Sequence, residues 1–232
     1  MKEQFARSAC LIGEEGVARL QRAKVAVFGL GGVGGFAVEA LARAGVGELL
    51  LCDNDAVSES NLNRQLLALR STLGQKKTQV AAARLKDINP EIRLTLREEF
   101  FLPANAETFD FSGYDYIVDA IDTLAAKVEL AKRGQIFGVP VISAMGAGNK
   151  LDPSSFRVSD LYKTAGCPLA RAMRSACRRA GIERLKVVWS PEEPKGSTLP
   201  PEHGRHAPGS ISFVPGACGL VLAGAVIKDL LA

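Results

Sequence analysis

The sequence lacks the paired cysteines from which structural zinc sites are commonly built. It contains five cysteines, and no two of them are spaced as C-x-x-C. A tetrahedral zinc site is therefore not recognisable, and we expect no zinc and reduced, buried thiols, as in proteins of a reducing compartment.

From the sequence we expect neither a secretory leader nor an uninterrupted membrane span. Residues 1–10 contain no apolar core like that of a signal peptide. The longest apolar stretch, residues 211–227, is interrupted by one proline and three glycines, whereas a spanning helix needs about 20 apolar residues in a row. We expect a buried terminal helix there, a cytoplasmic protein and no membrane partner.

The composition favours a globular chain and leaves its partner open. Hydrophobic residues make up 47% and charged residues 23%, which is enough apolar material for a core. The formal net charge of +4 permits nucleic acid as a partner without requiring it. The 232 residues contain no internal repeat and suit one large domain.

Apolar runs alternate with helical patterns through the first part of the chain. Strands are predicted at 24–29, 48–52, 91–97, 114–119 and 139–144, and helices over 11–24, 33–44, 75–88 and 127–137. This alternation predicts an α/β fold, Rossmann-like, with a mostly parallel sheet and helices on both of its faces.

The pattern changes after Met145. A basic helix is predicted over 164–180, strands at 185–189 and 210–214, and a terminal helix after them. Residues 190–209 are rich in proline, glycine and charge, and we expect a mobile loop there. We expect 1–232 to form a single domain, with 146–232 as an extension of the sheet that carries antiparallel strands.

A glycine-rich turn follows the first predicted strand. Gly29, Gly31 and Gly34 fit G-x-G-x-x-G, and Gly32 adds a further glycine to the run GLGGVG. Glycine lets the backbone approach a phosphate closely, and the following helix N-terminus offers free N–H groups. The turn indicates a nucleotide site, and the alternative is a turn needed only for packing.

Acidic and basic residues follow the turn in a fixed order. Asp53 lies about 20 residues beyond the glycines, where a carboxylate bonds a ribose hydroxyl of NAD or of ATP. Asp55 is a second candidate for contact with the nucleotide, and the alternative is that it is a turn residue or a helix cap. Arg64, in the run NLNRQ, and Lys77, in the run GQKK, are suited to stabilise charge on a triphosphate. Asn61, which begins the first run, can bond the same phosphate oxygens.

The run VDAID ends a further apolar strand in carboxylates. Asp122 stands at the carboxyl end of that strand, where it can bind Mg²⁺ together with phosphate oxygens. Asp119 is the alternative ligand, or simply a residue at the end of the strand.

The chain resembles the adenylating superfamily of ubiquitin-activating enzymes, including its bacterial ThiF-type members. The resemblance rests on the order and spacing of five motifs: GLGGVG, DND, NLNRQ, GQKK and DAID. The resemblance implies binding of ATP and Mg²⁺ and adenylation of a carboxylate, with release of pyrophosphate. It implies a ribose contact at Asp53 and a metal contact at Asp122. Phosphate contacts are implied at Asn61, Arg64 and Lys77. It further implies a homodimer in which Arg7 reaches the ATP of the partner subunit.

The second half resembles one branch of that superfamily, the tRNA threonylcarbamoyladenosine dehydratases. The resemblance rests on GAGNKLDP from residue 146, VSDLYKT from 158, CPLAR from 167 and PGSISFVP from 208. It implies adenylation of the threonine carboxylate of a modified tRNA adenosine, followed by ring closure with loss of water. Because the second attack is intramolecular, no enzyme nucleophile is needed. Cys167 therefore stays open between a carrier thiol and a packed one.

The basic helix independently suggests an RNA partner. Arg171, Arg174 and Arg178 recur at helical spacing and share one face, with Lys163 nearby. Such a face can follow phosphates, and the alternatives are a solvated helix face or a dimer contact.

Three other functions remain open from the sequence. They are an activator of a sulfur-carrier protein, a redox enzyme that uses NAD, and an inactive binding module. Arg64 and Lys77 have no evident role in the redox enzyme, and the missing cysteine pairs count against the sulfur-carrier activator. A sulfur-relay (cysteine desulfurase) partner and a monovalent cation near residues 146–149 also remain open.

Overall fold

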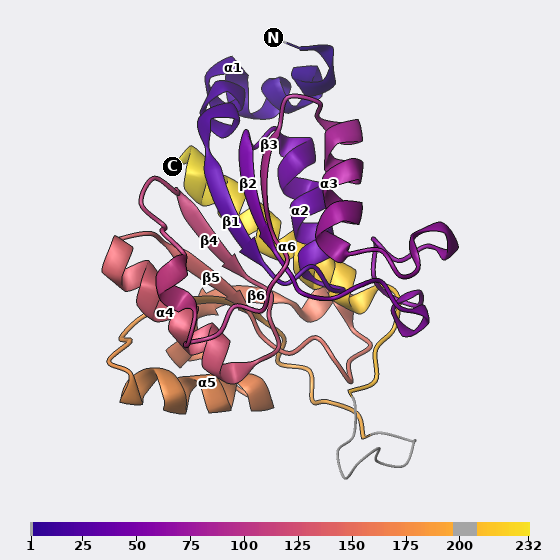
Figure 1. Ribbon diagram of the computed structural model, residues 1–232. Coiled ribbons are helices and arrows are strands. Elements are labelled where there is room, and N and C mark those ends of the chain that lie inside the picture. The colour runs from indigo at the N-terminus through magenta and orange to yellow at the C-terminus, as the bar shows by residue number, and fades with distance from the viewer. Residues whose placement is uncertain (1, 197–207) are drawn as a thin grey trace.

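The computed structural model describes residues 2–196 and 208–232, which form one seven-stranded sheet with helices on both faces (Figure 1). The strand order is β3-β2-β1-β4-β5-β7-β6. Five neighbouring pairs are parallel, and only β6 and β7 run antiparallel within this sheet. The predicted mostly parallel α/β fold is confirmed. The strands are β1 (Lys24–Phe28), β2 (Glu48–Cys52), β3 (Arg93–Arg97), β4 (Tyr116–Asp119), β5 (Val141–Ala144), β6 (Arg157–Asp160) and β7 (Lys186–Trp189).

The central strands are buried on both faces because their side chains alternate between two layers of helices. Val25 and Val27 of β1 face a core that also contains apolar side chains of α1, α2, α3 and α6. Ala26 and Phe28 face the opposite layer, where α4 and a cluster of phenylalanines pack, and α5 covers β7 on that side. The principal helices are α1 (Ala6–Arg22), α2 (Gly34–Ala44), α3 (Lys77–Ile88), α4 (Leu124–Phe137), α5 (Pro168–Arg179) and α6 (Val214–Leu231).

The terminal helix α6 is long and apolar enough to cross a membrane by composition, and 44% of its residues are buried in the fold. It crosses α2 closely, because a Cβ at Gly219 would lie 2.3 Å from the carbonyl oxygen of Val33. The crossing brings Pro215, near the start of α6, beside the glycine turn, where it would lie 3.0 Å from a Cβ at Gly32.

Two predictions for the second half were wrong. The predicted strand at 210–214 is absent: residues 208–213 form no strand, and α6 begins at Val214. Pro215 in the first turn explains the difference, since proline cannot donate to a sheet but is well suited to start a helix. The strand β6 was missed because it is short, polar and on the edge of the sheet.

The helices begin within about five residues of the predicted positions, and the first helix and the basic helix differ most. The basic helix begins at Pro168, and Lys163 lies before it in a short 3₁₀ turn. The first helix begins at Ala6 and is broken at Gly13, whose φ is 72°. Of the loop predicted at 190–209, residues 197–207 lie outside the described part of the chain.

Candidate functional site

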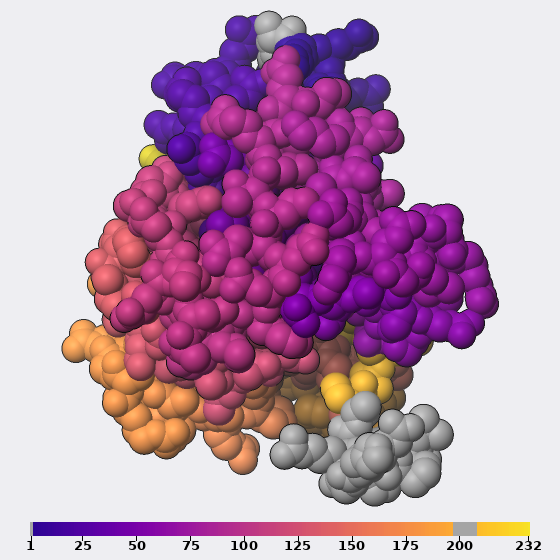
Figure 2. All heavy atoms as spheres, in the orientation of Figure 1, coloured from indigo at the N-terminus to yellow at the C-terminus, as the bar shows by residue number. Residues whose placement is uncertain are grey.

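A cavity of about 670 Å³ opens at the carboxyl ends of β1, β2, β4 and β5. In open parallel sheets this edge is the usual place for a ligand. The segments around residues 53–77 and 99–123 and the start of α6 border a recess near the lower centre of Figure 2. Most predicted nucleotide-site residues line it: Gly29, Gly31, Gly32, Asp53, Asp55, Asn61, Arg64, Lys77 and Asp122.

The glycine turn requires glycine at two positions for steric reasons. Gly29 has a φ of 87°, and a Cβ there would lie 2.6 Å from the carbonyl oxygen of Ala120. A Cβ at Gly34 would lie 1.8 Å from the carbonyl oxygen of Gly29. Gly34 therefore lies beneath the cavity wall, and its role is to let α2 begin directly against β1, with the N-terminus of α2 at the cavity.

The carboxylate of Asp53 holds the glycine turn in place. Its Oδ2 accepts a hydrogen bond from the backbone N–H of Leu30 at 2.6 Å, and its Oδ1 accepts one from the N–H of Asp55 at 2.8 Å. The side chain is only 9% exposed. Asp53 thus fixes the end of β2 to the turn after β1, and the lone pairs left on its oxygens can still accept from a ribose hydroxyl.

Lys77 begins α3 and points into the cavity wall. Its Nζ lies 2.6 Å from Asp55 Oδ2 and 4.0 Å from Asp53 Oδ1, while its side chain is 4% exposed. The backbone N–H of Lys77 also donates to the carbonyl of Asp55 at 3.0 Å. Lys77 is therefore held in one cluster with two carboxylates that lie 22 and 24 residues before it in the sequence.

Arg64 and Asn61 come from the short 3₁₀ turn over Glu59–Asn61 and the residues after it. Arg64 Nη1 donates to the carbonyl of Ser60 at 2.9 Å and to Asn63 Oδ1 at 2.8 Å. Asn61 is buried, and its Oδ1 accepts from the N–H of Ser58, so it also caps this turn. The guanidinium is thereby held at the cavity with donors still available to an anion.

The turn after β4 presents one carboxylate and buries another. Asp122 is exposed and lines the cavity, with only the hydroxyl of Thr123 bonded to it, at 3.3 Å. Asp119, the alternative metal ligand, is fully buried and pairs with Lys127 at 2.9 Å. Its Oδ2 also accepts from the hydroxyl of Ser143 at 2.5 Å. Asp119 is therefore a structural residue in this arrangement.

The carboxylates at the cavity fit a magnesium ion carried by a nucleotide. Mg²⁺ is commonly held by one or two carboxylates together with phosphate oxygens and water. Asp122 and the half-exposed Asp55 supply that number from opposite sides of the glycine turn. Within residues 2–196 and 208–232 no cluster of three or more His, Cys, Asp or Glu side chains could form a complete protein cage.

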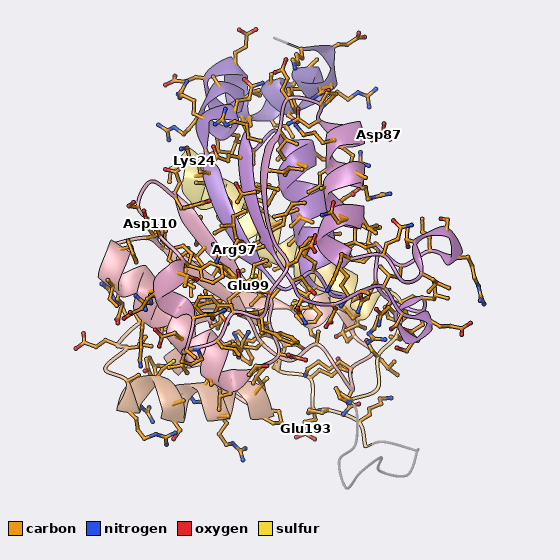
Figure 3. The ribbon with its side chains drawn as sticks, viewed as in Figure 1. Lys24, Asp87, Arg97, Glu99, Asp110 and Glu193 are labelled. Carbon is orange, nitrogen blue, oxygen red and sulfur yellow. The ribbon has the colours of Figure 1, made fainter. Side chains whose placement is uncertain are left out.

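Some residues of the cavity were not singled out from the sequence. Gln65 follows Arg64 in the motif, and its Oε1 is buried without a hydrogen-bond partner in the described structure. Lys150 is 3% exposed, and no sequence pattern marked its role. Phe100, which is 58% exposed, and Glu99 extend the wall beyond β3, where Glu99 pairs with Arg97 at 2.6 Å (Figure 3).

The predicted RNA-binding residues lie outside the cavity but next to it. The helix α5 begins at the cavity, since Cys167, Pro168 and Leu169 line it. Side chains tipped with nitrogen extend from the outer side of α5 in Figure 3. Among the described residues, none of Lys163, Arg171, Arg174 and Arg178 forms an ion pair.

The three arginines of α5 that were predicted to bind RNA differ in their surroundings. Arg171 is exposed. Arg174 is half-buried and donates to the carbonyl of Thr164 at 3.0 Å and to its hydroxyl. The guanidinium of Arg178 lies 5.2 Å from the ring centroid of Tyr162. The helical spacing therefore predicted a shared basic side, while the structure commits Arg174 in part to holding the preceding turn.

Arg7 lies at the other end of the sheet from this cavity. It is exposed on α1, which leads into the amino end of β1, whereas the cavity lies at the carboxyl ends of the strands (Figure 1). Arg7 is accordingly absent from the lining of the cavity of its own chain.

The thiols are mostly buried. Burial raises the pKa of Cys52 and of Cys218 to about 12 and that of Cys177 to about 11. Cys167 is buried at the cavity wall and precedes Pro168 at the start of α5, while Cys10 is exposed. The raised pKa values keep Cys52, Cys177 and Cys218 protonated and unreactive near neutral pH.

Comparisons with known proteins agree with this geometry. A tRNA threonylcarbamoyladenosine dehydratase from Bacillus subtilis (strain 168) is 41% identical over 243 residues, which cover 100% of this chain and 96% of the relative. The enzyme of the same name from Escherichia coli (strain K12) is 40% identical over 185 residues, 80% of this chain and 66% of the relative. A crystal structure of the E. coli enzyme in complex with ATP has a TM-score of 0.89 at 33% identity and covers 99% of this chain and 94% of that one.

A comparison with protein families also finds a match over nearly the whole chain. The pattern of the ThiF family matches residues 5–232, which include every element of the cavity wall described above. Since that match and the B. subtilis relative both run through nearly the whole chain, the protein belongs to the ThiF family.

Proposed function

We propose that this protein carries out the ATP-dependent dehydration of threonylcarbamoyladenosine in tRNA, by adenylating its threonine carboxylate. The observation that carries the proposal is the joining of two features at one cavity. A glycine turn with Arg64, Lys77 and Asp122 forms one wall, and the basic helix α5 begins at the other. The names of the B. subtilis and E. coli relatives support the same reaction.

ATP would lie across the carboxyl edge of the sheet. The ribose would bond Asp53, and the triphosphate would lie over the glycine turn, where the N-terminus of α2 offers free N–H groups. Arg64 and Lys77 would stabilise the charge that develops on the phosphates, because their cationic groups are already held at the cavity. Asn61 would donate its amide N–H to the same oxygens. The reported complexes of the E. coli relative with ATP and AMP support a nucleotide here.

Asp122 and Asp55 would hold the Mg²⁺ ion that accompanies ATP. When bound, the ion neutralises phosphate charge. Asp55 would then exchange part of its contact with Lys77 for the metal, which frees the ammonium for a phosphate oxygen.

The chemistry needs two successive displacements. A carboxylate oxygen of the threonyl group would attack the α-phosphorus of ATP, and pyrophosphate would leave. A nitrogen of the same modified side chain would then attack the acyl carbon, expel AMP and lose its proton as the ring closes. The net change in the nucleoside is the loss of one water. Because the attacking nitrogen is already tethered to the acyl group, proximity replaces an enzyme nucleophile, and Cys167 serves as a packed thiol in this scheme.

The tRNA would follow α5 away from the cavity. Arg171 and Arg178 present charge to solvent without an acidic partner in the described residues, and Lys163 adds charge from the preceding turn. Contacts of this kind to phosphates position a nucleic acid without reading its sequence. The modified nucleoside would then enter the cavity from the α5 side, where Leu169 and Gly146 line the wall.

The protein would work in the cytoplasm as a homodimer in which Arg7 reaches the nucleotide of the partner subunit. Arg7 cannot serve its own cavity from the opposite end of the sheet, so a role at the phosphates requires a second chain. The proposal requires no sulfur-relay partner, since no sulfur enters the reaction.

The direct test uses tRNA that contains threonylcarbamoyladenosine. The protein is incubated with this tRNA and Mg-ATP, the tRNA is digested gently, and the nucleosides are weighed by mass spectrometry. We expect a nucleoside lighter by one water, formed only when ATP is present. An unchanged nucleoside with protein that still binds ATP would contradict the proposal, and AMP transfer to a sulfur-carrier protein would then be measured.

A further inference from the structure

Lys150 is a buried lysine whose ammonium forms no ion pair with any residue in the described part of the chain. Its side chain is 3% exposed and lies in the wall of the cavity. The Nζ donates to the carbonyl oxygen of Ser190 at 3.4 Å and, more closely, to the carbonyl oxygen of Glu192. Its hydrogen-bond partners in the described part of the chain are these two backbone carbonyl oxygens.

The same short turn is bonded to residues 190–192 in the reverse direction. The carboxylate of Glu192 accepts from the N–H of Leu151 at 2.8 Å and from the N–H of Asp152 at 3.0 Å. Lys150 thus donates to the backbone of residues 190–192, and Glu192 accepts from the backbone of residues 151–152. The two segments, about 40 residues apart in sequence, are held together at the ammonium.

Asn149 connects two further segments of the chain to this turn. It has a φ of 60°, a conformation that asparagine tolerates better than most residues. Its N–H donates to the carbonyl of Gly209 at 2.7 Å, and its own carbonyl accepts from the N–H of Lys195 at 2.7 Å. The wall of the cavity formed by residues 146–150 is therefore joined to 190–195 and to 208–209 around the Lys150 ammonium.

An ammonium that donates to two carbonyl oxygens takes a position that an alkali metal ion can also occupy. Carbonyl dipoles that converge on one point replace the hydration shell of a monovalent cation, and a buried charge without such partners would be strongly unfavourable. We propose that the Lys150 ammonium is the resident cation of this turn, so that the cavity wall assembles without K⁺ or Na⁺. The carbonyls of Ser190 and Glu192 are already used, and the site therefore does not fit the monovalent metal that remained open from the sequence.

The proposal predicts that removal of the ammonium converts the turn into an alkali-ion site. Lys150→Met keeps the unbranched stem of the side chain, ends one atom before the ammonium, and leaves the carbonyl oxygens unpaired. We expect the melting temperature of wild-type protein to be the same in potassium chloride and in choline chloride of equal ionic strength. For Lys150→Met we expect a midpoint lower by about 5 °C in choline and a saturable recovery when K⁺ or Na⁺ is added.

A matched control lies on α3. Lys86 also donates to two backbone carbonyls, those of Pro90 and Ile92, but it is exposed. Lys86→Met should show no preference for K⁺ over choline, because water can solvate the released carbonyls. Lys150→Gln serves as a second variant, since it removes the charge but keeps a shorter polar side chain, and it should gain a weaker alkali dependence of the same kind.

Two results would overturn the proposal. One is a wild-type protein that is itself stabilised by K⁺ or Na⁺ relative to choline. The other is the absence of any alkali response in both Lys150→Met and Lys150→Gln. Because the readout is thermal unfolding, it does not depend on the reaction proposed above, and a failure of that reaction would leave the result of this experiment unchanged.

Discussion

Lys127 Nζ lies 2.9 Å from Asp119 Oδ2, and both side chains are fully buried behind the turn that carries Asp122. The same ammonium donates to the carbonyl of Ile121 at 2.9 Å, and Asp119 Oδ1 accepts from the N–H of Ile121 at 3.1 Å. The ion pair therefore holds both the N–H and the carbonyl group of Ile121, the residue directly before Asp122.

Removal of one partner of this pair should be strongly destabilising. Lys127→Met leaves the Asp119 carboxylate buried and unpaired, and we expect a loss of about 3–5 kcal/mol in the free energy of unfolding, measured by urea denaturation. The double variant Lys127→Met, Asp119→Asn should recover part of that loss, because no isolated charge remains. A single variant as stable as the wild type would contradict the electrostatic role of the pair.

The two cations at the glycine turn should act on the rate of adenylation more than on the fold. Arg64→Ala and Lys77→Ala are each expected to lower ATP–pyrophosphate exchange, driven by the modified tRNA, by about 10²–10³-fold. Arg70→Ala is the matched control, since Arg70 pairs with Glu59 on the exposed surface nearby. A near wild-type rate in Arg64→Ala or Lys77→Ala would show that the phosphate role belongs to other residues.

The metal role of Asp122 can be separated from activity by a binding measurement. Asp122→Asn should bind a nonhydrolysable ATP analogue as tightly as the wild type in EDTA, but it should lose the gain in affinity that Mg²⁺ confers. Isothermal titration calorimetry with and without Mg²⁺ measures both values. If Mg²⁺ strengthens binding to Asp122→Asn as much as to the wild type, the metal is held elsewhere.

The arginines of α5 should contribute unequally to tRNA binding. Arg171→Ala and Arg178→Ala should each weaken binding and reduce the slope of log K against log salt by about 1, because each removes one phosphate contact. Arg174→Ala should in addition lower the melting temperature, since Arg174 holds the carbonyl of Thr164. Lys132→Ala on α4 is the control, and an unchanged salt slope in Arg171→Ala would argue against the proposed path of the tRNA.

The contribution of Arg7 across a dimer can be tested by mixing two inactive proteins. In a heterodimer of Arg7→Ala and Asp122→Ala subunits, the cavity of the Arg7→Ala chain retains Asp122 and receives Arg7 from its partner. After unfolding and refolding together, the mixture should regain roughly a quarter of wild-type activity, since half of the dimers are mixed and each has one complete site. No recovery would mean that Arg7 does not act in trans.

Much of the fold and the nucleotide wall could be predicted because their signals are local. The strands β1, β2 and β4 are short apolar runs that end at glycine or aspartate, and the parallel order of such strands brings their carboxyl ends to one edge. The strict spacing of Gly29 and Gly34 reflects a steric requirement within one turn. Sequence periodicity is sufficient where the contacts that matter lie within one strand, turn or helix.

The tertiary structure alone decided which charged groups meet. The sequence by itself determined the alternation of strands and helices, the glycine turn and the arginines on one side of α5. It could not show that Lys127 secures Asp119, that Arg174 bonds Thr164, or that Lys150 lies between the carbonyls of residues 190 and 192. The sequence also suggested a strand at 210–214, whereas the structure has no strand there and α6 begins at Val214. These features depend on contacts between distant segments, and the free energy of a buried charge is set by partners that only the folded chain brings within reach.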